Sequence, residues 1–148
     1  MVAASEGGYP RAVLDVVVAG DESWVRDEVC SVLSAMPDVE VREATSGPAV
    51  LVAAQENEPD LVVLDQQIGN MGAVAVCLDL RLEEGADRLV HIPVLMLLDR
   101  RADVFLARRS AADGWLLKPL DPIRLRKAIT ELLEGGTYFD ESYRPAPA

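Results

Sequence analysis

The sequence predicts a three-layer α/β fold in which a parallel sheet of five strands lies between two layers of helices. Short apolar runs of strand length alternate along the chain with segments whose apolar residues recur at helical spacing. Short loops join these segments, as in units where a helix connects two parallel strands. Near-continuous apolar runs such as 61–64 are typical of strands covered on both faces. The 148 residues fit one such domain.

Five apolar runs are expected to form the strands. Most are uninterrupted, but Asp15 breaks the first, and the second alternates between apolar and polar residues. The third stops at Asp65, directly after its apolar run. The expected strands are residues 13–19, 39–44, 61–64, 92–98 and 114–117.

Periodicity and stop signals place one helix after each strand. The first helix is capped by Asp21 or Ser23 and ends at Pro37. A Gly-Pro pair at 47–48 opens the second, and two glycines at 135–136 end the last. The later helices are expected at residues 47–57, 74–84, 99–110 and 121–134.

We expect one folded domain over residues 12–134. Residues 1–11 are expected to be a flexible leader and residues 135–148 a flexible C-terminal tail, because both are rich in Gly, Pro or polar residues. The start does not resemble a secretory signal, and no apolar stretch reaches the length of a membrane span. The sequence therefore predicts a cytoplasmic protein without a membrane segment and without room for an output domain.

The net charge of -11 argues against nucleic-acid binding, which depends on neutralising phosphates with Lys and Arg. Positive charge is nevertheless concentrated in the last third of the domain. This basic segment is interpreted either as a solvated helix surface or as a docking face for an acidic protein. Its basic residues are Arg100, Arg101, Arg108, Arg109, Lys118, Arg124, Arg126 and Lys127.

Three charged residues follow the predicted strands at one edge of the sheet. Asp21, Asp65 and Lys118 each come at the carboxyl end of an apolar run, where doubly wound sheets bind ligands. A carboxylate there can accept a phosphoryl group if Mg²⁺ and an ammonium offset the charge repulsion. Singly, the residues have simpler interpretations: Asp21 as a helix cap, Asp65 as a turn cap and Lys118 as a solvated loop lysine.

Over residues 13–134 the chain closely resembles the receiver domain of two-component response regulators. The resemblance rests on VVVAGDE at 16–22, PDLVVLD at 59–65, IPVLML at 92–97 and ADGWLLKP at 112–119. It implies a flavodoxin-like doubly wound sheet of strand order 2-1-3-4-5 with five helices. It also implies a cis peptide bond before the proline that follows Lys118.

The resemblance assigns roles to single residues. Asp65 would be the phosphoacceptor and Lys118 the phosphate-binding ammonium. Mg²⁺ would be held by Asp21, Asp65 and the backbone carbonyl of Gln67. Trp115 stands at the position of the switch aromatic.

Three positions depart from the family's pattern. Gly20 replaces the first acid of the metal site, Leu98 replaces the Thr or Ser that binds a phosphoryl oxygen, and Asp99 replaces a small residue. Mg²⁺ binding is therefore expected to be weak unless Asp99 or Glu22 turns inward. Leu98 has no donor, and a lost hydrogen bond to a charged group costs about 1.5–3 kcal/mol.

The resemblance places the usual docking and dimer surface on the fourth helix, fifth strand and fifth helix. Here that surface carries Phe105 as an apolar anchor among bases such as Arg108, Arg109, Arg124 and Lys127. A protein partner, a histidine kinase or a second copy of the chain are its expected partners. The alternative is that Phe105 turns inward and the bases keep the helix soluble.

We therefore expect an atypical single-domain receiver that signals through protein contacts, without enzymatic output and independently of phosphorylation. Two alternatives stay open: a working switch phosphorylated on Asp65 by a histidine kinase, and the receiver fragment of a transcription factor. A flavodoxin-like enzyme or nucleotide-binding domain has no support, because no Gly-rich phosphate loop follows the first strand. His91, the only histidine, precedes a strand at the opposite edge.

Overall fold

A computed structural model describes residues 13–69 and 71–142 of the chain. All six strands are parallel and form one sheet of order β2-β1-β3-β4-β5-β6. In chain order the elements are β1 (Leu14–Ala19), α1 (Ser23–Ser34), β2 (Val39–Ala44), α2 (Gly47–Glu56), β3 (Leu61–Asp65), α3 (Ala73–Gly85), β4 (Val94–Leu98), the 3-10 helix η1 (Arg101–Asp103), α4 (Val104–Arg109), β5 (Gly114–Leu117), α5 (Pro122–Leu133) and β6 (Tyr138–Phe139).

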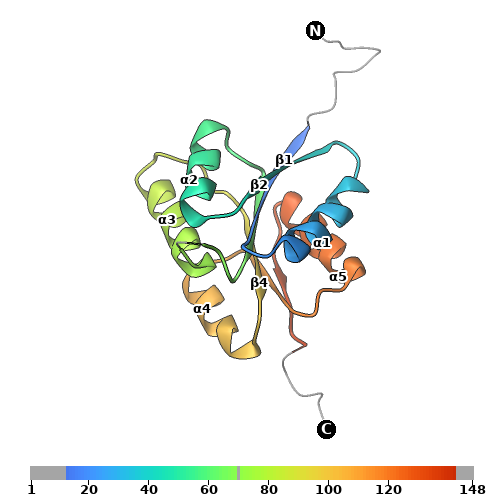
Figure 1. The fold of residues 1–148 in the computed structure, drawn as a ribbon. Helices are drawn as coiled ribbons and strands as arrows, with labels where there is room; N and C mark the ends of the chain where they lie inside the picture. The colour runs from blue at the N-terminus through green and yellow to red at the C-terminus, as the bar shows by residue number, and fades with distance from the viewer. Residues whose placement is uncertain (1–12, 70, 143–148) are drawn as a thin grey trace, which may run out of the picture.

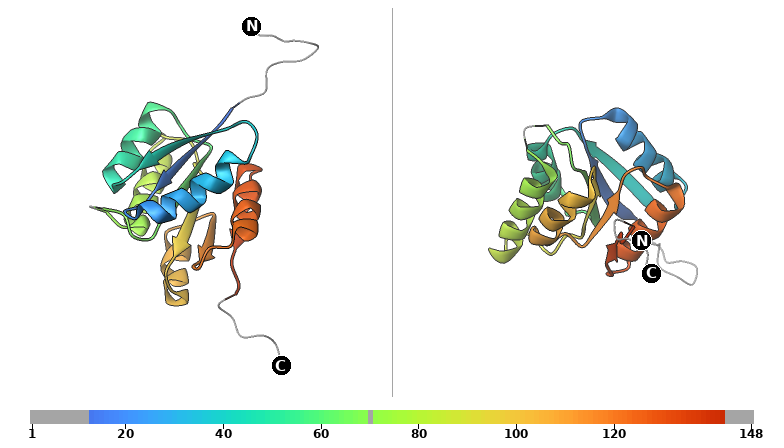
Figure 2. Two further views of the ribbon diagram at one scale, coloured as in Figure 1. Left: turned by 45° about the vertical axis from the view of Figure 1, so that its right-hand side comes forward. Right: turned by 90° about the horizontal axis from the view of Figure 1, so that it is seen from below.

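Helices cover both faces of the sheet, as the sequence predicted. Figure 1 shows α2, α3 and α4 on one side of the strands and α1 and α5 on the other, and the right-hand view of Figure 2 shows the three layers end on. The central strands β3 and β4 are buried along their whole length. This explains their uninterrupted apolar sequences.

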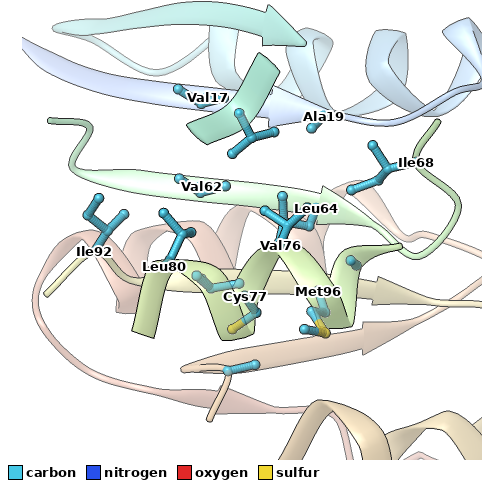
Figure 3. Close-up of a cluster of buried hydrophobic side chains, with 14 of the residues drawn as sticks. Val17, Ala19, Val62, Leu64, Ile68, Val76, Cys77, Leu80, Ile92 and Met96 are labelled. Atoms are coloured by element: carbon cyan, nitrogen blue, oxygen red, sulfur yellow. The ribbon is translucent and has the colours of Figure 1, made fainter. Parts of the chain in front are cut away.

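Each face of the sheet has its own core. Figure 3 shows Val62 and Leu64 of β3 facing Val76 and Leu80 of α3. The opposite face packs the alternate residues of the same strands against α1 and α5, with Val63 among them. Full burial of side chains of this size stabilises a domain by about 1.5–3 kcal/mol each, so these two layers hold the strand ends in place.

Asp15, the polar residue inside the first apolar run, is neutralised where it stands. Arg42 of β2 donates to both of its carboxylate oxygens, at 3.0 and 2.7 Å, and Asn57 donates to Oδ2 at 2.8 Å. A paired carboxylate can occupy a mostly buried strand because its hydrogen-bonding capacity is met.

The predicted order 2-1-3-4-5 is confirmed, but the sheet has a sixth strand that sequence reasoning missed. Tyr138–Phe139 pairs with β5, inside the region expected to be a flexible tail. Asp140 directly after it is buried. The expected tail therefore does not hold for residues 138–140, while the expected leader and residues 143–148 lie outside the described part of the chain.

Two smaller expectations are settled by the backbone. The segment expected to be one basic helix at 99–110 instead starts as η1 and continues as α4. The peptide bond between Lys118 and Pro119 is cis, as the resemblance implied. None of the helices in 13–69 and 71–142 is both long and apolar enough to cross a membrane.

Candidate functional site

The carboxyl ends of β1, β3, β4 and β5 meet at one edge of the sheet. Asp65 is the last residue of β3 and lies in register with Leu97 of β4. Leu98 ends β4 opposite Leu117, the last residue of β5. The parallel register thus brings Asp65, Asp99 and Lys118 together, although they are distant in sequence.

The ammonium of Lys118 joins two carboxylates. Its Nζ lies 2.5 Å from Asp65 Oδ1 and 2.7 Å from Asp99 Oδ1. The Lys118 side chain is only 15% exposed. Burial alone would lower the pKa of Lys118, but the hydrogen bonds that its ammonium donates to Asp65 and Asp99 outweigh burial and raise that pKa. Lys118 is therefore a fixed cation and not a solvated loop lysine.

Asp65 is 1% exposed, and one of its oxygens has no partner. Oδ1 accepts from Lys118, whereas Oδ2 is buried without a hydrogen bond from any described residue. Desolvation raises the pKa of Asp65, and the hydrogen bond from Lys118 offsets this only in part. A buried carboxylate with one unpartnered oxygen is only partly compensated for its burial, and that oxygen is placed to act as a nucleophile.

Asp99 is a built-in member of the site. Besides Lys118, its carboxylate accepts from Gln67 Nε2 at 3.1 Å, and its backbone N–H donates to Gln66 Oε1 at 2.7 Å. Burial opposes ionisation of Asp99, yet its hydrogen bonds with Lys118 and Gln67 lower its pKa. The loop after β4 is thereby tied to the loop after β3 by a charged carboxylate.

Asp21 is exposed and does not join the other two carboxylates. Its backbone N–H donates to the carbonyl of Gln67 at 3.0 Å. The cap of α1 is Glu22, whose side chain makes no capping bond, so the suggested caps Asp21 and Ser23 were wrong. Asp21 therefore lies in the loop after β1, exposed, with its backbone bonded to the loop after β3.

Arg26 is a contributor that sequence reasoning missed. Its guanidinium donates to the carbonyls of Gly20 at 2.6 Å and Asp21 at 3.1 Å, and to Glu43 at 3.1 Å. It places a positive charge against the backbone of the loop after β1. The one available signal was its position on the first turn of α1, which faces the strand ends; nothing in the sequence shows the contact itself.

Comparisons with known proteins decide what this site belongs to. Residues 16–130 match the family model described as the response regulator receiver domain. This chain belongs to the response regulator receiver family. Receiver domains are modules of two-component signalling that interact with histidine kinases and other proteins.

Individual relatives agree with this family. The nitrate/nitrite response regulator NarL of Escherichia coli K12 is 29% identical over 134 residues, which are 90% of this chain but 61% of NarL. The response regulator PleD of Caulobacter vibrioides is 33% identical over 69% of this chain and 22% of PleD. The solved signal receiver domain of a NarL from Mycobacterium tuberculosis has a TM-score of 0.73 at 29% identity, over 84% of this chain and 99% of that one.

Receiver domains typically bind Mg²⁺ beside the phosphoacceptor, but the residues of this receiver do not make a complete magnesium site. Asp65 Oδ2 is an unpartnered oxygen, Asp21 is exposed, and Gly20 has no side-chain oxygen. Within residues 13–69 and 71–142, no three His, Cys, Asp or Glu side chains are grouped to hold a metal ion. Asp99 does turn inward, but toward Lys118.

The two positions that the resemblance assigns to the switch share one apolar cluster. Leu98 and Trp115 are both buried, at 1% and 2% exposure, on the face covered by α3 and α4. The Trp115 ring packs against Phe139 at 4.5 Å between centroids, and the guanidinium of Arg108 lies 5.3 Å from its centre. The ring of Trp115 therefore contacts both Phe139 of β6 and Arg108 of α4.

The residues of the predicted docking face differ in exposure and pairing. Phe105 is 59% exposed, so the alternative that it turns inward as core is wrong. Arg109 lies over the Phe105 ring at 5.5 Å, and both line a groove of about 330 Å³ between α3 and α4. Arg124, in contrast, is engaged by Asp140 at 2.6 Å, while Lys127 is exposed.

Proposed function

We propose that this receiver works as a phosphorylation-independent protein-interaction module. The observation that carries the proposal is the double pairing of Lys118. Its ammonium, which in the proposed site would meet a phosphoryl group on Asp65, already has Asp65 and Asp99 as partners. The positive charge of Lys118 that would stabilise a phosphoryl group is therefore already paired with carboxylates of this chain.

Electrostatics opposes a phosphoryl group at this position. A phosphoryl group on Asp65 would bring its negative charge next to Asp99, because both carboxylates bond to the same ammonium. Like charges this close repel each other strongly in a site screened from water. Leu98 offers no hydroxyl to offset that repulsion. The missing hydrogen bond is worth about 1.5–3 kcal/mol, comparable to the few kcal/mol that separate two states of a switch.

The same reasoning gives the proposed cofactor and partners. Mg²⁺ binds weakly, at millimolar concentrations or not at all, because one carboxylate of the site is absent. The partner is a protein that docks on the face carrying Phe105, Arg108, Arg109 and Lys127, in the cytoplasm and without nucleic acid. This chain spans 61% of the length of the NarL relative. The proposal therefore covers the receiver domain and assigns no activity to a longer protein.

A second function is favoured by a separate observation. Oδ2 of Asp65 has no partner, and the Lys118 ammonium is already next to Oδ1. An unpartnered carboxylate oxygen beside a cation is the arrangement that a phosphoacceptor needs. The second candidate is therefore a working phospho-switch modified on Asp65 by a histidine kinase.

Intact mass after incubation with acetyl phosphate and Mg²⁺ separates the two candidates. The expected result for the interaction module is no added phosphoryl mass in the wild type. Asp99→Ala is expected to allow some, because the competing carboxylate is removed. A phosphorylated wild type, with no addition to the matched Asp65→Asn variant, would establish the switch instead.

A further inference from the structure

The sixth strand covers the edge of β5 with the chain's own C-terminal segment. After α5 the chain turns back, and Tyr138–Phe139 lies beside Gly114 and Trp115 in parallel register (Figure 2). Tyr138 N donates to Asp113 O at 3.3 Å and Asp140 N to Trp115 O at 3.1 Å. Unpaired strand edges can pair with extended segments, and here a segment of the same chain pairs with the edge of β5.

The residue after this short strand is held by a built anion site. Asp140 is 1% exposed; its Oδ2 accepts from the backbone N–H of Leu117 at 2.9 Å. Its Oδ1 accepts from Arg124 at 2.6 Å and from Ser142 N at 2.9 Å. Despite desolvation, these hydrogen bonds lower the pKa of Asp140. A carboxylate therefore takes the place of the next backbone bond of the β5 ladder.

An aromatic platform lies beside the anion site. Phe139 packs on the buried ring of Trp115, and the Arg108 guanidinium also lies near that ring. Phe139 itself keeps 43% of its surface exposed, so it is seated on the platform without being enclosed. Aromatic pairs and cation–π contacts both stabilise a residue seated in this way.

Gly114 allows the strand to come this close. A Cβ at position 114 would lie 2.6 Å from the carbonyl oxygen of Tyr138, a separation that real Cβ atoms do not show. Only a glycine there admits a backbone at this distance. The edge of β5 is thus shaped to receive an extended main chain.

We propose that the β5 edge, with Trp115, Arg108 and Arg124, is a binding site for an extended segment of a partner protein that carries an aromatic residue followed by aspartate. In the free chain β6 fills the site. Backbone pairing supplies general affinity, while the aromatic platform and the anion site select the side chains. A two-residue ladder is short enough to exchange with a competing segment of the same chemistry. The proposal is independent of whether Asp65 is phosphorylated.

The test uses the full chain with its own strand disabled by Phe139→Ala and Asp140→Ala. The probe is a fluorescently labelled peptide of residues 136–142 with blocked ends, read by anisotropy. The peptide is expected to bind the double variant saturably and the wild type at least tenfold more weakly, because β6 competes. A peptide with Asn in place of the aspartate should bind at least tenfold more weakly as well.

Controls keep the result interpretable. Arg124→Gln added to the double variant should abolish peptide binding, and melting curves show whether each variant is folded. If the double variant unfolds, Asp140→Asn alone serves as the opened chain. No binding to a folded, opened chain, or equal binding of the Asp and Asn peptides, would overturn the proposal. Dimers of the wild type that the peptide dissociates would assign the site to a second copy of this chain and would overturn the proposal of a partner protein.

Discussion

Gly20 and Asp65 are packed so closely that a Cβ added at Gly20 would lie 2.8 Å from the Cβ of Asp65. The sequence alone makes Gly20→Asp the obvious way to restore the magnesium site. The structure adds that any side chain there must push the phosphoacceptor position aside, because the Cβ of Asp65 cannot move without its backbone.

The first prediction follows from this contact. Gly20→Ala, which adds bulk but no charge, is expected to lower the free energy of unfolding by about 1–3 kcal/mol. Gly20→Asp should lose at least as much and should not by itself give tight Mg²⁺ binding. Denaturant unfolding and Mg²⁺ titration measure both. An unchanged stability of Gly20→Ala would show that the strands can spread at this point.

The second prediction concerns the double pairing of Lys118. Lys118→Met leaves two carboxylates close together, one of them buried, and should destabilise the fold by about 3 kcal/mol. Asp65→Asn in the Lys118→Met background should recover part of this loss, since it removes the buried charge. Thermal unfolding of the two variants at neutral pH measures the effect. Equal stability of wild type and Lys118→Met would mean that water, and not Lys118, solvates Asp65.

The third prediction is a pH dependence at Asp65. Its folded pKa is raised above the unfolded value of about 3.9. The native state then holds the proton more tightly than the unfolded chain. The free energy of unfolding therefore falls as pH rises from the unfolded pKa to the folded pKa of Asp65, and the loss of stability is complete at neutral pH. Asp65→Asn should therefore be more stable than wild type at pH 7–8, by about 1 kcal/mol, with the gap closing toward acid. If the stability difference between Asp65→Asn and wild type grew on acidification, the folded pKa of Asp65 would be lowered and not raised.

The fourth prediction concerns His91, at the opposite edge of the sheet. Its ring nitrogens lie 2.9 Å from Glu84 and 2.9 Å from Asp113, with Arg81 also bound to Asp113. Partial burial would lower the pKa of His91, but the two carboxylates raise it. A raised folded pKa gives stability that is present below about pH 6.5 and is lost as pH rises through the folded value. His91→Gln should cost about 0.5 kcal/mol at pH 6 and nothing at pH 9, measured by urea unfolding.

The fold was predictable because its signals are local. Strands buried on both faces must be apolar throughout, and helices with one buried face show it in their spacing, so the order of elements follows from the chain. The strand ends then place Asp65 and Lys118 at one edge without further information. The sequence is sufficient to predict an element where burial alone determines which residues are apolar.

The missed features depend on partners far along the chain. β6 has two residues, too few for any period, and it follows two glycines among acidic and turn-forming residues. Its stability comes from Trp115 and Arg124, which no local pattern reveals. The turn of Asp99 toward Lys118 and the reach of Arg26 to Gly20 are likewise set by side-chain direction across loops.

The last prediction concerns the coupling between Asp65 and Trp115. In this receiver Leu98, on the strand between β3 and β5, has no hydroxyl, and the Trp115 ring contacts Phe139 and Arg108. The phosphate mimic beryllofluoride should therefore leave the Trp115 environment unchanged, even at concentrations that occupy Asp65. Trp24 is more than half exposed and would confuse the signal, so the measurement uses a Trp24→Phe background. The probe is the indole N–H resonance of Trp115.

A matched Leu98→Thr variant tests the physical reason: if the missing hydroxyl is the cause, the mimic should shift the resonance only in that variant. A shift in the Leu98 chain itself would show that this receiver transmits phosphorylation by another route, and would count against the interaction module proposed above.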